Sequence, residues 1–352
     1  MSEQTEEIVW DKDPLCFIFH NEVPGKVKMH TKRLDWEDWI KIDNTYPAQM
    51  KLRQQLLDST RETVFVSNDD ESVAEAKQEL LEKIIEYLPT RFPDKFERRQ
   101  GGIFNKILKE FVSDASSDAE DPLIRAGRLT AEDWVILQWD EAEEAFKLTA
   151  GIVFFPMRWS LTEKWNKDMA GIHQPVQSFE KHLSKNVASL FKAMSPQSPV
   201  WRANWAVFND LYGPLDLYSP AGHLDRKETN QVTSYEGELT GTKLTFRAEY
   251  QTICKLPASR ALVFSIRTYQ RFLSDFRKFP LEDSLGLIRA IETLEPDFYV
   301  YKGAEFWREA AVRYLEDIVL QRERTSRVKT LLSTTLLAGL AIVLGYSLTN
   351  RR

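Results

Sequence analysis

The sequence predicts an α+β fold, in which helices flank an antiparallel sheet, followed by one C-terminal transmembrane helix. Helical periodicity dominates up to residue 112, and strand-like alternation then appears between residues 133 and 269. Helices return after the last strand. Because helices and strands are segregated along the chain, the α+β class is favoured. An uncharged apolar segment at residues 330–348 predicts the membrane helix.

Composition places the chain among globular proteins. Of its 352 residues, 43% are hydrophobic and 28% are charged, which excludes collagen-like and wholly disordered classes. The formal net charge of −6 argues against a general nucleic-acid-binding surface. Two cysteines, Cys16 and Cys254, exclude a disulfide framework, and no paired Cys/His spacing predicts a zinc site. Aromatic residues make up 12% of the chain, which suits a core or pocket built from large flat side chains.

The part of the chain before the strands is predicted to be an irregular N-terminal arm, residues 1–30, followed by helices. A helix is expected to begin at Tyr46, because the next residue is proline, which suits the first helical turn. Ser72–Leu88 has apolar residues at helical spacing, and Pro89 is expected to end that helix. Phe104–Val112 is predicted to be a shorter helix.

The sheet is predicted from segments in which apolar and polar residues alternate. These segments are Asp133–Trp139, Phe146–Phe155, Val200–Phe208, Lys243–Thr252 and Arg260–Tyr269. The first two are joined by the acidic turn DEAEEA and form a predicted hairpin. Residues 213–242 are a long polar insertion between two of the strands. Further helices are predicted at Gln177–Met194, Glu282–Leu294 and Gly303–Glu323.

The C-terminal segment predicts a tail anchor. Residues 330–348 would span ~28 Å as a helix, close to the hydrocarbon thickness of a bilayer, and basic residues stand on both sides. We therefore expect one domain over residues 31–323, facing the cytosol, and a basic linker and anchor over residues 324–352. The membrane is expected to be the mitochondrial outer membrane or the endoplasmic reticulum. The alternative is a C-terminal helix buried within the protein.

A first set of candidate site residues lies on one predicted strand. Arg247, Glu249 and Gln251 follow each other at two-residue spacing, so their side chains share one face of the strand. A cation, an anion and an amide on one face can bind a small polar ligand. The alternative is a solvated outer face that carries an ordinary ion pair.

A second candidate is His173, within the segment GIHQPV. Neutral imidazole is the commonest metal ligand in proteins and a usual axial ligand of haem. The alternative is a loop histidine held by backbone hydrogen bonds. Arginines beside aromatic residues can hold anionic groups by charge-assisted hydrogen bonds, or they can stack on the neighbouring rings. Three arginines have such neighbours: Arg158, Arg202 and Arg267.

Six stretches occur in an order typical of one protein family. They read DWIKIDNTYPAQM, YLPTRFP, FFPMRWSLTEKW, GIHQPV, PVWRANW and FRAEYQTICKLPASRALVFSIRTY. In this order they resemble the haem-dependent oxidative N-demethylase family, formerly a domain of unknown function and labelled "HRQ" in some descriptions. The resemblance covers roughly residues 31–320. The soluble enzymes of the family lack the predicted tail, so the chain resembles a membrane-tailed variant.

The resemblance implies a PAS-like antiparallel sheet flanked by helices, with haem b in its pocket. Bacterial members remove a methyl group from small secondary amines such as dimethylamine and release formaldehyde. They use dioxygen and electrons from partner reductase subunits. This chain has no nucleotide-binding motif and no cysteine cluster for an iron–sulfur centre, so a separate reductase is expected. The alternative is a tail-anchored haem sensor or haem carrier without turnover.

The resemblance also implies roles for single residues. His173 matches the family's IHxPV motif and is the expected haem-linked histidine, either as the axial ligand of the iron or as part of the pocket wall. Arg247, Glu249 and Gln251 match its R-x-E-x-Q-T stretch, where Glu249 is expected to hold a cationic amine. The arginines of neighbouring motifs are expected to hold the haem propionates: Arg158, Arg202 and Arg267.

Overall fold

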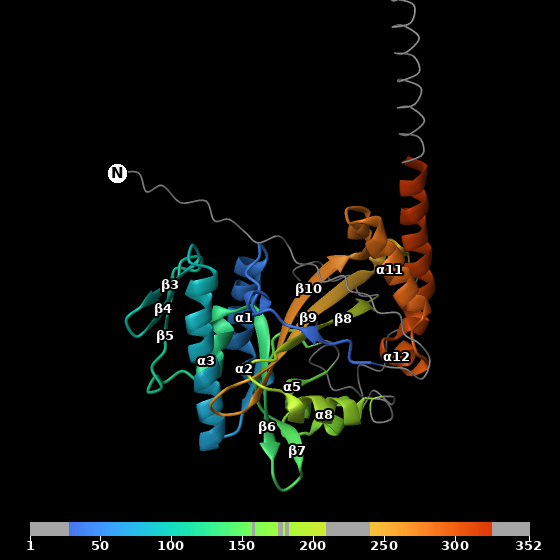
Figure 1. Cartoon of the computed structure of the whole chain (residues 1–352). Coiled ribbons are helices and arrows are strands. Elements are labelled where there is room, and N and C mark those ends of the chain that lie inside the picture. The colour runs from blue at the N-terminus through green and yellow to red at the C-terminus, as the bar shows by residue number, and fades with distance from the viewer. Residues whose placement is uncertain (1–27, 157–158, 175–178, 180–182, 209–239, 326–352) are drawn as a thin grey trace, which may run out of the picture.

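The computed structural model describes residues 28–156, 159–174, 179, 183–208 and 240–325. A seven-stranded antiparallel sheet forms its centre, with strand order β1-β8-β9-β10-β6-β7-β2 (Figure 1). The long strands β9 and β10 lie in the middle, so most of their backbone groups pair on both sides. The strands are β1 (Lys32–Arg33), β2 (Phe65–Ser67), β6 (Glu132–Asp140), β7 (Ala145–Ile152), β8 (Val200–Phe208), β9 (Thr245–Lys255) and β10 (Leu262–Phe272).

The predicted strands are all present, and the predicted hairpin corresponds to β6 and β7. Its acidic turn is closed by Asp140, whose carboxylate accepts hydrogen bonds from the backbone N–H groups of Ala142 and Glu143. A second hairpin joins β9 to β10, where the N–H of Leu256 donates to the carbonyl of Ala261 at 2.9 Å. The alternation of apolar and polar residues therefore located the five long strands correctly, but it did not predict the short strands β1 and β2 at the two edges of the sheet.

One face of the sheet is covered by helices α1 (Tyr46–Ser59), α3 (Glu71–Arg91) and α4 (Pro122–Leu129), with the short α2 (Arg61–Val64) beside them. These helices bury apolar side chains against Tyr250, Cys254 and Val263 of the central strands. The predicted helix starting at Tyr46 is confirmed, with proline in its first turn. This face is a continuous core in which large aromatic side chains contact one another edge-to-face.

The opposite face is covered by three short helices and by the first described residues of the chain. Helices α5 (Leu161–Lys164), α6 (Met169–His173) and α8 (Ser184–Ala193) form this layer. Helices α11 (Leu281–Glu292) and α12 (Pro296–Tyr301) and the helical residues 304–325 follow the sheet, and a third core joins α11 and the helical residues to Val207 and Phe246. The remaining helical turns are η1 (Trp36–Asp38), η2 (Gly241–Lys243) and η3 (Leu273–Arg277).

The predicted helix at residues 104–112 is wrong. A small second sheet occupies this region, and its strands are β3 (Phe96–Arg99), β4 (Gly102–Asn105) and β5 (Glu110–Ser113). Ile103 lies opposite Val112, so burial of both side chains favours the hairpin over a helix.

The predicted end of the helix at Pro89 is two residues early, because α3 continues to Arg91. A proline in the last turn removes only one backbone hydrogen bond, and Phe92 still donates to the carbonyl of Leu88 at 2.8 Å.

The fold class needs one correction. Among the residues that the structure describes, no helix combines the length and the apolar character that crossing a membrane requires. The predicted span at residues 330–348 lies outside the described residues, as does most of the predicted insertion at residues 213–242. The described part of the chain is therefore an α+β arrangement of a large antiparallel sheet flanked by helices, and none of its helices is the transmembrane helix that the sequence predicts.

Candidate functional site

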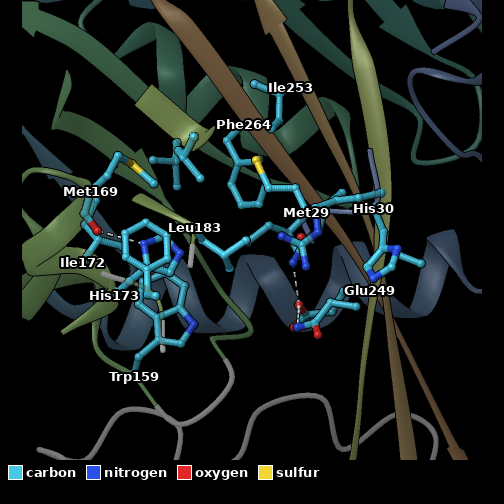
Figure 2. A pocket seen from close by; sticks show the side chains of 18 of the residues that line it. Met29, His30, Trp159, Met169, Ile172, His173, Leu183, Glu249, Ile253 and Phe264 are labelled. Carbon is cyan, nitrogen blue, oxygen red and sulfur yellow. Dashed lines mark hydrogen bonds between the residues drawn. The ribbon is translucent and has the colours of Figure 1, made fainter. Parts of the chain in front are cut away.

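A cavity of about 280 Å³ lies between the sheet and the layer of short helices (Figure 2). Its walls come from strands β6 to β10, from helices α5, α6, α8 and α12, and from residues 28–30. The cavity thus collects segments that are far apart in the sequence. Such a hollow, mostly apolar and with a few polar groups, is the usual form of a small-molecule or cofactor site.

The apolar part of the wall follows directly from strand pairing. Ile253, Phe264 and Val135 lie opposite one another on β9, β10 and β6, so alternation directs all three side chains to the same face. Leu183 and Phe191 close the cavity from the helical side. An apolar lining of this kind excludes water and lowers the local dielectric constant.

His173 is the last residue of α6, whose first turn is capped by Asp168 through a hydrogen bond from the N–H of Gly171. The Nδ1 atom of His173 lies 2.9 Å from the carbonyl oxygen of Met169 (Figure 2). A carbonyl only accepts hydrogen bonds, so Nδ1 is the donor and Nε2 carries the lone pair of the neutral ring. The ring stacks on Phe179, with centroids 4.0 Å apart.

The imidazole of His173 is neutral at physiological pH. Burial lowers its pKa to about 4, and the positive charges of Arg202 and Lys164 act in the same direction, while the hydrogen bond to Met169 opposes them. A neutral imidazole that is oriented by a backbone carbonyl is the form in which histidine binds metal ions. The predicted metal-ligand residue therefore lies in the cavity, in the protonation state that ligation requires.

The side chains of Arg247, Glu249 and Gln251 form one hydrogen-bonded group on β9. The Nε and Nη2 atoms of Arg247 donate to Oε1 of Glu249 at 3.1 and 3.0 Å. Gln251 Nε2 and Asn204 Nδ2, the latter from β8, donate to Oε2 at 2.9 and 3.1 Å. Arg247, Glu249 and Gln251 are 3%, 4% and 8% exposed. The alternative interpretation included an ion pair, which is present between Arg247 and Glu249. It also placed that pair on a solvated outer face, and this part is wrong because the side chains are buried.

The cavity is lined by only part of this group. Glu249, Gln251 and Asn204 contribute to its wall. The guanidinium of Arg247 instead turns toward the backbone carbonyl of Phe155 and the hydroxyl of Thr268, 3.2 Å away. Arg247 therefore anchors Glu249 from behind the wall.

The three predicted propionate-binding arginines fall in different places. Arg202 lines the cavity, directly opposite Gln251 on the neighbouring strand. Arg158 lies outside the described residues. Arg267 is fully buried on the opposite face of the sheet, where its Nη2 atom donates to Asp43 Oδ2 at 2.9 Å. The geometry thus gives Arg267 a structural role, remote from this cavity.

Other polar residues of the wall were not singled out from the sequence. His30 lines the cavity, and its backbone is in the left-handed region, at φ 52°. The pKa of its imidazole is lowered, mainly by burial. Strand β1 follows His30 in the sequence and pairs with β8, and this pairing holds residues 28–30 beside the cavity. No periodicity marks His30, because it precedes the first strand. Asn204 was detectable, since alternation places it on the same face as Arg202.

The donor set suits haem better than a bare metal ion. Within the described ranges, no three or more His, Cys, Asp or Glu side chains gather at a point where they could hold a metal. A porphyrin supplies four ligands of its own, so one imidazole is a sufficient protein ligand. His173 offers that imidazole inside an apolar cavity that also contains positive side chains, which fits an iron porphyrin with anionic propionates.

Comparison with protein families agrees with this geometry. The family described as haem-dependent oxidative N-demethylase, alpha subunit-like, matches residues 30–312. The match covers most of the chain and includes every residue that forms the cavity wall except Lys28 and Met29.

Proposed function

The chain belongs to the haem-dependent oxidative N-demethylase alpha-subunit-like family, and on this premise we propose that the cavity binds haem b and that the protein demethylates a small amine. The reaction would use dioxygen and electrons from a separate reductase. The observation that carries the proposal is His173. Its neutral ring is oriented by Met169 and stacked on Phe179 inside an apolar cavity.

The residues of the cavity divide into three roles. His173 would hold the iron, and Arg202 would hold a propionate by a charge-assisted hydrogen bond. Haem, when bound, supplies the oxidising chemistry at the C–H bond next to nitrogen. The apolar residues exclude water and confine the amine. The polar group around Glu249 orients the nitrogen of the substrate, so that the methyl group points toward the centre of the cavity.

The proposal is tested by the absorption spectrum of full-length protein purified from haem-supplied cells. We expect a Soret band, which is lost or shifted in His173→Ala and retained in His30→Ala, the matched variant of the second cavity imidazole. A colourless wild-type protein would refute haem binding. An unchanged band in His173→Ala would assign the iron to another residue.

Turnover is tested separately, by formaldehyde release from dimethylamine with a reductase and dioxygen. A band that shifts with dimethylamine, together with formaldehyde release, is the expected result. A band that no amine shifts, without formaldehyde release, would favour the alternative of a haem sensor or carrier.

A further inference from the structure

The carboxylate of Glu249 has no acceptor site left for a ligand. An ionised carboxylate offers about four lone-pair positions, two on each oxygen. Arg247 fills the two positions of Oε1 with its Nε and Nη2 atoms. Asn204 and Gln251 fill the two positions of Oε2. An ammonium ion would have to displace one of these donors, and the charge of Glu249 is already compensated by Arg247.

The same hydrogen bonds fix the orientation of two amide groups. A carboxylate cannot donate, so the NH₂ groups of Asn204 and Gln251 must face Glu249, and their carbonyl oxygens must point away from it. Both residues line the cavity. Within the described residues, neither carbonyl oxygen accepts a hydrogen bond. Asn204 lies directly opposite Glu249 and Gln251 lies two residues further along β9, so both amides adjoin the same carboxylate oxygen at the wall of the cavity.

We propose that Oδ1 of Asn204 and Oε1 of Gln251 bind the N–H groups of the substrate, and that Glu249 is a positioning residue that orients both amides. The ligand class is an amine with N–H donors, and a secondary ammonium with two such donors fits best. Selection therefore depends on the number of N–H groups and not on positive charge. The inference rests on the proposed function only in taking an amine as the ligand.

A series of equally charged probes tests this inference. Dimethylammonium, trimethylammonium and tetramethylammonium each carry one positive charge at neutral pH, but they carry two, one and no N–H donors. Their dissociation constants are measured by calorimetry on the haem-loaded full-length chain, and again after haem removal. We expect affinity to fall about tenfold for each N–H that is lost, the value of one charge-assisted hydrogen bond. Equal affinities for all three probes would overturn the inference.

Two variants assign the effect to the amides. Asn204→Leu and Gln251→Met remove one acceptor each at similar side-chain size, and each is expected to abolish one tenfold step. Gln138→Met is the matched control, since this strand amide lies outside the cavity wall and donates to the carbonyl of Ser72. If the tenfold differences in affinity between the probes persist in both variants, the protein distinguishes the probes by size alone and the inference is overturned. Circular dichroism verifies folding, and if Asn204→Leu does not fold, Gln251→Met decides.

The positioning role of Glu249 has its own readout. In Glu249→Gln the new amide can donate as well as accept, so the orientation of its neighbours is no longer enforced. We expect the differences among the three probes to shrink while tetramethylammonium binding stays the same. If Glu249 instead binds the amine by charge, all three probes lose affinity equally, and the inference fails. Because the series is also measured without haem, its outcome is separable from failure of the proposed haem binding.

Discussion

Replacing Arg267 by methionine is expected to lower the free energy of unfolding by about 3–5 kcal/mol, with or without haem. The guanidinium of Arg267 is completely buried and lies 2.9 Å from Oδ2 of Asp43, which also accepts a hydrogen bond from the hydroxyl of Tyr269 at 2.8 Å. Methionine fills most of the volume but leaves the buried carboxylate without its counter-charge. The loss is measured by urea unfolding, followed by tryptophan fluorescence at neutral pH.

The matched variant is Arg202→Met, because both arginines were predicted from sequence to hold propionates. Arg202 lines the cavity, so this variant is expected to weaken haem binding while stability without haem falls by less than about 1 kcal/mol. The opposite pattern, in which Arg267→Met keeps its stability and loses haem, would refute the assignment of Arg267 to the structural core.

The pH dependence gives an independent measure of the same ion pair. Burial alone would raise the pKa of Asp43, but the charge of Arg267 and hydrogen bonds from Thr45 and Tyr269 lower it overall below its usual value of 3.8. A lowered pKa in the folded state means that the stabilisation is present above pH 3.8 and is lost as pH falls through the lower value. In Arg267→Met this pKa rises, so Asp43 contributes less stability above pH 3.8, and the loss of stability that this group causes on acidification should be smaller than in the wild-type protein.

Two further predictions concern positions outside the cavity. Burial raises the pKa of the Cys254 thiol to about 12, so iodoacetamide at mildly alkaline pH should alkylate Cys254 only after unfolding, as measured by peptide mass spectrometry; rapid labelling of folded protein would contradict its burial. In Gly102→Ala the new Cβ would lie 2.1 Å from the carbonyl oxygen of Val112, so the β4–β5 hairpin must separate and stability should fall by about 1–3 kcal/mol in urea unfolding. Unchanged stability would show that the hairpin adapts without cost.

The sheet was predictable because period-two alternation persists along each of its long strands. The segment around Phe104 was not, since its two strands are four residues each, too short for alternation to be told from helical spacing. The end of α3 was misplaced for a related reason. Proline is a strong signal within a helix but a weak one in its last turn, where few backbone hydrogen bonds remain to be lost.

The candidate site was predictable in part. His173 and Glu249 were selected by residue type and by family resemblance, and both line the same cavity. The side chain of Arg267 was assigned to the wrong face because the prediction used its aromatic neighbour and not its strand register. Opposite Tyr250 of β9, Arg267 belongs to the face of the sheet that is turned away from the candidate site. His30 was missed because a residue before the first strand has no periodicity to place it.

Two buried ion pairs that involve strands β9 and β10 have the same chemistry, and the face of the sheet on which each lies decides its consequence. Burying charges is costly, and well-packed apolar residues often replace such pairs without loss of stability. The pair between Arg267 and Asp43 lies in the continuous core, so its removal is felt only as instability. The pair between Arg247 and Glu249 borders the cavity, where the carboxylate fixes two amides. A one-residue shift in the pairing of β9 would move each of its side chains to the opposite face of the sheet. The register of β9 therefore decides whether a charged side chain on this strand lies in the core, where it affects stability, or at the cavity, where it affects ligand binding.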